Sequence, residues 1–209
     1  AAKRRFFCKK VADMLKVGVT GGIGSGKTLV CRIFKTLGIP VFDADTAAKR
    51  LMASDPALMR AIRNEFGAKA YSSDGSLNRA YLAQHVFSNE TALTRLNALV
   101  HPAVIQAGEE WAARQRAPYT VKEAALLFET GSYKKNDYNI LVTAPIPLKI
   151  RRVMERDGLT ADQVRARMDK QWPDERKAAL ADFTVVNDGV QALIPQVLTL
   201  HRSFLAQQP

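Results

Sequence analysis

The chain has 209 residues, 47% of them apolar and 24% charged, a composition that is ordinary for a globular protein and argues against disorder. Its formal net charge of +11 favours anionic ligands, whether nucleic acid, membrane headgroups or phosphorylated metabolites, without choosing among them. The two cysteines show no paired spacing, which argues against a disulfide framework or a zinc site, and no apolar run approaches the roughly 20 residues that span a bilayer.

Residues 1–13 are basic and lack the apolar stretch of a signal peptide, so we interpret them as an N-terminal extension, disordered or not native, outside the fold. Beyond them, short apolar runs alternate with longer helical stretches, a pattern typical of βαβ units and a parallel sheet. Continuous apolar strands also predict that helices cover both faces of the sheet. The predicted strands are 15–20, 41–43, 119–127, 138–144 and 184–187.

Two long helical segments separate these strands. The first, about residues 46–116, lies between the second and third strands and is predicted to be all-helical. Within it, His101-Pro102 interrupts an apolar-periodic run, which predicts two helices or one kinked helix there. The second segment, 147–181, separates the fourth and fifth strands, and a last helix follows near the C-terminus.

The motif that carries the chemistry lies directly after the first predicted strand and opens the first predicted helix. Residues 21–28 match G-x-x-x-x-G-K-[ST] in full and in the required strand–loop–helix context. Glycines let successive backbone N–H groups point at a phosphate, and the helix N-terminus adds its positive dipole end. Lys27 is predicted to reach the β- and γ-phosphates, and the Thr28 hydroxyl to ligate Mg²⁺. The predicted nucleotide contacts in this loop are Gly22, Ile23, Gly24, Ser25, Gly26, Lys27 and Thr28.

Other glycine-rich nucleotide sites fit this loop less well. A dinucleotide-binding fingerprint would need its third glycine at Lys27 or Leu29. GTPase switches carry Asp-x-x-Gly and Asn-Lys-x-Asp, and neither spacing occurs in the chain. The sequence therefore favours a phosphate loop of another class.

Two acids follow the second predicted strand, in Val41-Phe42-Asp43-Ala44-Asp45. The carboxyl ends of parallel strands face the ligand crevice, so Asp43 and Asp45 are predicted to lie across from the phosphate loop. One carboxylate would accept a proton from an attacking hydroxyl, while the other helps to hold Mg²⁺ through water. The alternative is that an acid here caps the next helix.

The assembled pattern resembles the dephospho-CoA kinase family over residues 14–206. The departures are Thr28-Leu29 for the usual Ser-Thr, Asn78 for Asp, and Glu123-Ala124-Ala125 for Asp-x-Pro, so no role is predicted for Glu123. The landmarks besides the phosphate loop are Leu37-Gly38, Val41-Phe42-Asp43-Ala44-Asp45, Phe66-Gly67, Asp74-Gly75-Ser76-Leu77-Asn78-Arg79, His101-Pro102, Leu126-Leu127-Phe128-Glu129, Arg152 with Arg156-Asp157, Arg167 with Gln171, and Asn187-Asp188-Gly189.

The resemblance implies an α/β fold of the P-loop NTPase type: a five-stranded parallel sheet flanked by helices, an inserted helical substrate-binding domain and a helical lid. The kinase domain would occupy residues 14–206. Its parts would be a P-loop core at about 14–45, 117–146 and 182–206, the substrate domain at about 46–116 and the lid at about 147–181.

The resemblance also implies a reaction: transfer of the ATP γ-phosphoryl group to the ribose 3′-hydroxyl of dephospho-CoA, giving CoA and ADP, the final step of coenzyme A biosynthesis. Mg²⁺ is the implied cofactor, and ATP and dephospho-CoA are the implied partners. We expect a cytoplasmic monomer that binds neither nucleic acid nor membranes.

By residue, the resemblance assigns catalysis to Asp45 as base, with Lys27 and the lid residue Arg152. Thr28 would bind Mg²⁺, with Asp43 as a candidate for a contact through water; which of Asp43 and Asp45 is the base stays open. Further expected ATP contacts are Arg156 and Asn187, and the expected substrate contacts are Asp43, Asp45, His101 and Glu129, the last at the end of the third strand.

Two other functions remain as alternatives. A kinase for a nucleotide or another small metabolite would use the same core, and it would phosphorylate a nucleoside monophosphate but not dephospho-CoA. A nucleic-acid-binding protein would suit the +11 charge, although the chain has no recognisable RNA-binding motif or basic–aromatic stripe. Steep salt dependence of nucleic-acid binding would identify it.

Overall fold

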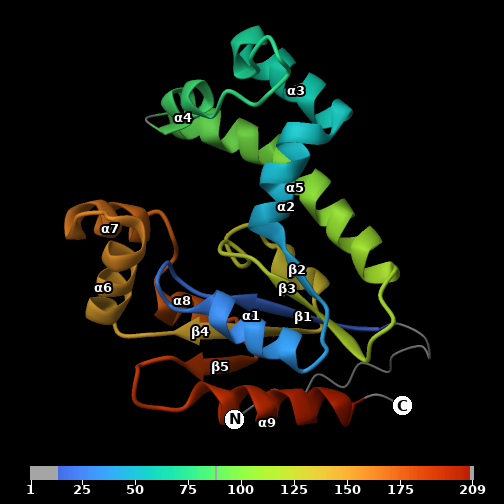
Figure 1. Cartoon of the computed structure of the whole chain (residues 1–209), viewed down its shortest axis with the longest axis vertical. Helices are drawn as coiled ribbons and strands as arrows, with labels where there is room; N and C mark the ends of the chain where they lie inside the picture. The colour runs from blue at the N-terminus through green and yellow to red at the C-terminus, as the bar shows by residue number, and fades with distance from the viewer. Residues whose placement is uncertain (1–13, 88, 208–209) are drawn as a thin grey trace. The chain divides into compact units, whose positions relative to one another are not determined.

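The computed structural model describes residues 14–87 and 89–207 (Figure 1). The expectation for residues 1–13 lies outside these described residues. The chain divides into two compact units: residues 43–114 form one, and the segments on either side of them form the other, which contains most of the sheet.

The sheet has five parallel strands in the order β2-β3-β1-β4-β5. In β1–β3 pairing Val19 lies opposite Glu123, and in β1–β4 pairing Thr20 lies opposite Leu141, so β1 is the central strand. The expected α/β class, with a P-loop NTPase fold, is confirmed. The strands are β1 (Leu15–Thr20), β2 (Val41–Asp43), β3 (Tyr119–Glu123), β4 (Tyr138–Thr143) and β5 (Phe183–Val186).

The third strand is shorter than the sequence predicts. β3 ends at Glu123, and the chain then turns over residues 125–130, where the Thr130 hydroxyl donates to the Leu126 carbonyl at 2.8 Å. The apolar run continues because Leu127 and Phe128 are buried after the strand has ended, at 0% and 1% exposed, and not because they extend β3. Over so short a run, a buried turn and a buried strand show the same apolar pattern. The sequence therefore overestimates the length of β3.

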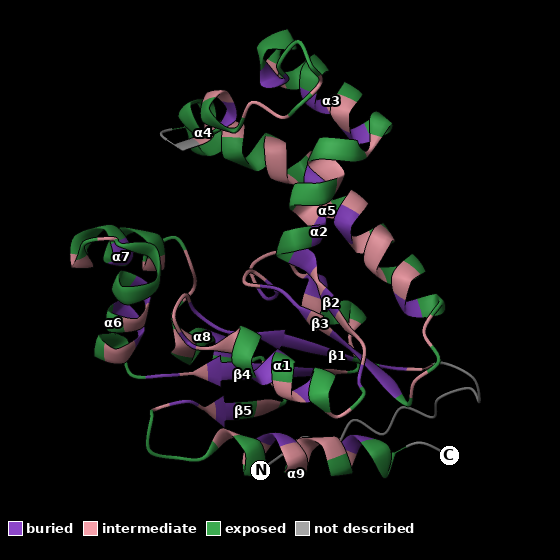
Figure 2. Ribbon diagram, viewed as in Figure 1, coloured by how far each residue is buried: buried purple, intermediate pink, exposed green. Residues whose placement is uncertain are grey.

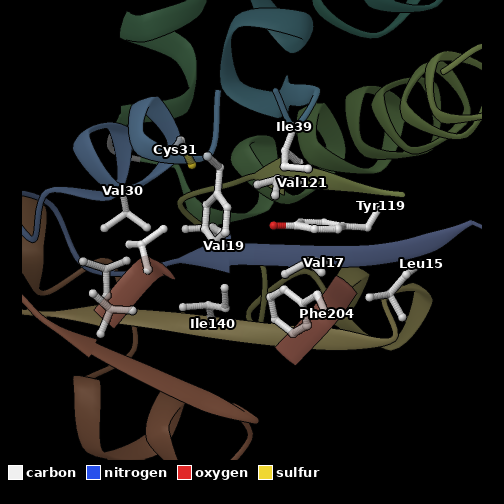
Figure 3. Close-up of a cluster of buried hydrophobic side chains, with 14 residues drawn as sticks. Leu15, Val17, Val19, Val30, Cys31, Ile39, Tyr119, Val121, Ile140 and Phe204 are labelled. Carbon is white, nitrogen blue, oxygen red and sulfur yellow. The ribbon is translucent and has the colours of Figure 1, made fainter. Parts of the chain in front are cut away.

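Helices α1 (Lys27–Thr36) and α9 (Leu193–Leu205) pack against the sheet and enclose its main apolar core. Figure 3 shows this cluster, with Cys31 contributed by α1 and Phe204 by α9 around the strand residue Tyr119. The Tyr119 hydroxyl is hydrogen-bonded to Nδ1 of His201 at 2.7 Å, so this buried polar group is satisfied within the core.

The rest of this unit consists of one short helix after β3 and three helices between β4 and β5. Lys149 and Ile150 are buried in the first of those that follow β4, and Val164 and Lys177 in the next two. The elements are η2 (Ser132–Lys135), α6 (Ile146–Asp157), α7 (Ala161–Met168) and α8 (Asp174–Ala178).

The unit formed by residues 43–114 is helical, as the sequence indicates. Side-chain caps begin three of its helices: Asp43, Asp55 and Asn89 each accept a backbone N–H three residues ahead. Pro102 lies inside one continuous helix of 24 residues, so the alternative of two separate helices is wrong. The elements are α2 (Ala44–Ser54), α3 (Pro56–Phe66), η1 (Ala68–Ala70), α4 (Arg79–Phe87) and α5 (Glu90–Ala113).

Burial follows these two units, each with its own interior (Figure 2). The strands of the sheet are largely buried, whereas the helices of residues 43–114 bury one face through residues such as Leu58 and Ile62. Among the described helices, none combines the length and the apolar character needed to cross a membrane.

Candidate active site

The phosphate loop is closely packed on both sides, which explains two of its glycines. Gly24 and Gly26 adopt φ values of +78° and +93°, a region that side-chain-bearing residues rarely occupy. A Cβ atom on Gly26 would lie 2.1 Å from Nδ2 of Asn187, and one on Gly24 would lie 2.5 Å from the carbonyl oxygen of Lys149. The loop is therefore enclosed by the turn after β5 and by the first turn of α6.

Lys27 is the first residue of α1, directly after Gly26. Its ammonium group donates to the Gly21 carbonyl at 2.9 Å, so the side chain reaches back from the end of the loop to its first residue. The backbone bonding of α1 begins with the Leu29 and Val30 amides, which donate to the Gly26 carbonyl, and the amides before them, with the helix dipole, favour an anion at this end. The loop amides, the helix terminus and the ammonium together make this loop a candidate anion site.

A carboxylate lies beside the other key side chain of the loop. The Thr28 hydroxyl donates to Oε1 of Glu123 at 2.8 Å, and Glu123, at the end of β3, is only 8% exposed. Cys31 lies one helical turn further along α1. The pKa of its thiol is raised mainly by burial and, to a smaller extent, by the nearby Glu123 charge. Glu123 thus places a buried negative charge next to the hydroxyl expected to bind a metal ion.

Arg152 of α6 contacts the loop and the turn after β5. Its guanidinium donates to the carbonyl and side-chain oxygens of Asn187 at 3.1 and 3.2 Å, and to the Gly24 carbonyl at 3.5 Å. Asn187 in turn donates from Nδ2 to the Ser25 carbonyl at 2.8 Å. The structure therefore brings together three predicted site residues, Arg152, Asn187 and Gly24, in one hydrogen-bonded cluster.

Comparison with known proteins decides the family. The family model described as dephospho-CoA kinase matches residues 15–192. The dephospho-CoA kinase of Salinibacter ruber is 45% identical over 179 residues, covering 84% of this chain and 90% of that protein. The chain belongs to the dephospho-CoA kinase family.

Solved structures share the fold of this chain. A crystal structure from Thermus thermophilus matches with a TM-score of 0.79 and 32% identity, covering 95% of this chain and all of that one. The dephospho-CoA kinase of Campylobacter jejuni matches with a TM-score of 0.66 over 91% of this chain and 97% of its own, and at 24% identity it shows the shared fold alone.

Glu123 is the site residue that sequence reasoning missed. The dephospho-CoA kinase resemblance led away from it, because Glu123-Ala124-Ala125 stands where the family has Asp-x-Pro. The available signal was its position as an acid directly after an apolar strand, where many P-loop proteins hold Mg²⁺. The acids Asp43 and Asp45 after the second strand match the same expectation, and they obscure this signal.

Arg156, expected to contact ATP, is paired with its neighbour. Its guanidinium makes a bidentate contact with Asp157 at 2.7 and 2.9 Å, and its side chain is 63% exposed. Because the Arg156 guanidinium donates hydrogen bonds to the Asp157 carboxylate, the pKa of Arg156 is raised and the pKa of Asp157 is lowered. The structure does not bring Arg156 into the cluster that Arg152 forms with the loop.

Three predicted site residues belong to the 43–114 unit. Asp43 caps α2, with Oδ1 accepting the Thr46 amide at 2.9 Å and Oδ2 accepting the Thr46 hydroxyl at 2.7 Å. Asp45 is exposed in the first turn of the same helix, and His101 is half-buried in α5. Asp43 therefore caps the helix, as the alternative predicts, whereas Asp45 is the second residue of the helix itself.

Glu129 does not end the third strand, because β3 stops six residues earlier and Glu129 lies in the turns that follow. Its Oε1 accepts the Trp172 amide at 3.0 Å and forms an ion pair at 3.0 Å with Nζ of Lys177, which is fully buried. Glu129 therefore supplies the counter-charge of a buried lysine. This placement does not favour its predicted contact with substrate.

The Glu129–Lys177 pair gives a stability prediction. Glu129→Gln keeps an oxygen for the Trp172 amide but leaves the Lys177 ammonium buried without its counter-charge, so we expect a loss of about 3 kcal/mol in the free energy of unfolding. Urea unfolding measures this loss. Glu155→Gln is the matched control, because its pair with Arg151 is 68–69% exposed and should change stability by less than about 0.5 kcal/mol. Equal stability of the two variants would contradict the prediction.

No group of three or more His, Cys, Asp or Glu side chains suited to a metal ion occurs within residues 14–87 and 89–207. Mg²⁺ in kinase sites usually keeps several waters and is held by one or two protein oxygens together with substrate phosphates. The Thr28 hydroxyl and the Glu123 carboxylate, 2.8 Å apart, supply hard oxygen donors of that kind.

Proposed function

We propose that this chain is a dephospho-CoA kinase in activity, transferring the γ-phosphoryl group of ATP to the ribose 3′-hydroxyl of dephospho-CoA. The observation that carries the proposal is the family match over residues 15–192, together with a phosphate loop that is folded for anion binding. The products would be CoA and ADP.

The phosphate loop would bind the triphosphate of ATP. Its amides and the start of α1 would hold the phosphates, and the Lys27 ammonium would exchange the Gly21 carbonyl for phosphate oxygens. Arg152 lies against the same loop and would add a second fixed positive charge near the developing negative charge. Asn187, held by Arg152 and bonded to Ser25, would border the nucleotide.

Thr28 and Glu123 would hold the Mg²⁺ that accompanies ATP, Thr28 directly and Glu123 directly or through water. Bound there, the ion would neutralise charge on the β- and γ-phosphates. We assign this metal contact to Glu123 and not to Asp43, because both oxygens of Asp43 cap α2.

Asp45 would serve as the base that orients or deprotonates the 3′-hydroxyl. Of the two acids after β2, Asp43 caps α2 with both of its oxygens, whereas the Asp45 side chain is exposed in the first turn of that helix, so we assign the contact with substrate to Asp45. We further propose the 43–114 unit, which contains His101, as the substrate-binding domain and residues 147–181 as the lid.

A substrate panel tests the function. ADP release is measured with Mg-ATP and, in parallel, dephospho-CoA, AMP, CMP and UMP as acceptors. Among these four acceptors, we expect only dephospho-CoA to give ADP release well above background. Release with a nucleoside monophosphate but not with dephospho-CoA would instead identify a nucleotide kinase built on the same core.

A further inference from the structure

A short segment that follows α7 and includes most of α8, residues 171–177, is anchored inside the sheet-containing unit; we call it the brace. Lys177 at one end is fully buried against Glu129. Asp174, in the middle, pairs with the ammonium of Lys149, a residue of α6 that is only 3% exposed. Buried ammonium groups are held in place by their carboxylate partners, so the brace has two fixed points.

From this anchored segment one side chain reaches the phosphate loop. Oε1 of Gln171 accepts a hydrogen bond from the backbone N–H of Ile23 at 2.8 Å. The loop and the brace are also in close contact nearby, since a Cβ on Gly22 would lie 3.4 Å from Nζ of Lys149 and 3.7 Å from Oε1 of Gln171. Gln171 therefore touches the loop as part of a packed surface.

The Gln171 bond acts on a single rigid group. The peptide that joins Gly22 to Ile23 is planar, so its N–H and its carbonyl turn together. Its N–H donates to Gln171, and its carbonyl accepts the Ser25 amide at 3.1 Å, within the loop itself. The two hydrogen bonds fix the orientation of this peptide and, through Ser25, the path of the chain toward Gly26 and Lys27.

We propose that Gln171 is a positioning residue for ATP: its carboxamide, held by the brace, keeps the phosphate loop in the shape that receives the triphosphate. The inference rests on the proposed ATP-dependent function and adds to it a residue outside the loop. A loop already ordered before binding loses less conformational freedom when the phosphates arrive, which increases affinity. Gln171 itself does not touch the reacting atoms.

The test compares Gln171→Met with a matched variant, Gln163→Met. Gln163 also accepts a backbone N–H through Oε1, that of Thr160 at 3.0 Å, but in the capping box of α7 and not in the loop. Gln171 is half-buried and lies outside the core, so its variant should fold, as should the matched control. Thermal unfolding checks that both variants are folded. Calorimetry then measures the dissociation constants of Mg-ATP, inorganic tripolyphosphate and adenosine.

For Gln171→Met we expect Mg-ATP and tripolyphosphate to bind about tenfold more weakly, because the Ile23 amide loses its partner, while adenosine binds as before. Gln163→Met should lower the melting temperature and leave all three dissociation constants unchanged. Unchanged ATP binding in Gln171→Met would overturn the proposal. So would equal losses for ATP and adenosine, or an equal loss in Gln163→Met, since each indicates a general loosening of structure.

These readouts are separate from the test of the overall function. If the wild-type protein bound ATP but did not phosphorylate dephospho-CoA, the proposed reaction would fail, while the difference between the two glutamine variants would still support the role of Gln171.

Discussion

Lys27→Ala is expected to lower kcat for dephospho-CoA phosphorylation by about a thousandfold or more. In the proposed reaction the Lys27 ammonium stabilises the negative charge of the transferring phosphoryl group, and in the structure it donates to the Gly21 carbonyl of the loop. Removing it leaves the amides and helix terminus, so ATP should still bind, more weakly. Steady-state kinetics with varied ATP measure both effects.

Lys35→Ala is the control for this change. Lys35 lies in the last turn of the same helix and is exposed, so it alters the charge of α1 equally without touching the loop. Its kcat should stay within twofold of the wild-type value. If Lys27→Ala retained a tenth or more of the wild-type kcat, the assignment of Lys27 to the transferring phosphate would be wrong.

Asp45→Asn should lower kcat by about a hundredfold to ten-thousandfold, the usual contribution of a positioned base. The dissociation constant of Mg-ATP should change little, because the proposed role of Asp45 concerns the acceptor hydroxyl and not the nucleotide. Asparagine keeps the shape of the side chain and helps to begin a helix, so folding should be preserved. Rapid-quench kinetics and an ATP titration separate the chemical step from binding.

Two further variants interpret that result. Asp74→Asn removes an exposed acid of the same unit, one whose Oδ1 accepts the Ser76 amide in a turn, and should leave kcat unchanged. Asp43→Asn keeps an oxygen to cap α2 and tests which acid is the base. A full kcat in Asp45→Asn with a large loss in Asp43→Asn would reverse the assignment of the two residues.

The parts of the site that the sequence predicts well are those defined by local contacts. The phosphate loop spans eight residues, and its glycines are required by the path of its own backbone. The cap at Asp43 likewise depends on a residue three positions ahead. Alternating apolar and helical segments likewise indicate a parallel sheet, although they overestimate the length of β3.

The parts that the sequence did not predict depend on residues far apart in the chain. Gln171 reaches an amide 148 positions earlier, and Glu123 meets Thr28 across 95 positions. Glu129 was expected at a strand end that faces ligand, but the chain turns at residue 125 and pairs Glu129 with Lys177. A charged residue in an apolar run looks the same in sequence whether it meets a substrate or a buried partner.

The most direct test of the assigned function is the identity of the product. The wild-type protein is incubated with Mg-ATP and dephospho-CoA, and the acceptor is analysed by mass spectrometry and ³¹P NMR. We expect ADP and an acceptor that has gained one phosphoryl group on the ribose 3′-oxygen, in equal amounts. Unchanged dephospho-CoA, or ADP with free phosphate in place of phosphorylated acceptor, would contradict it.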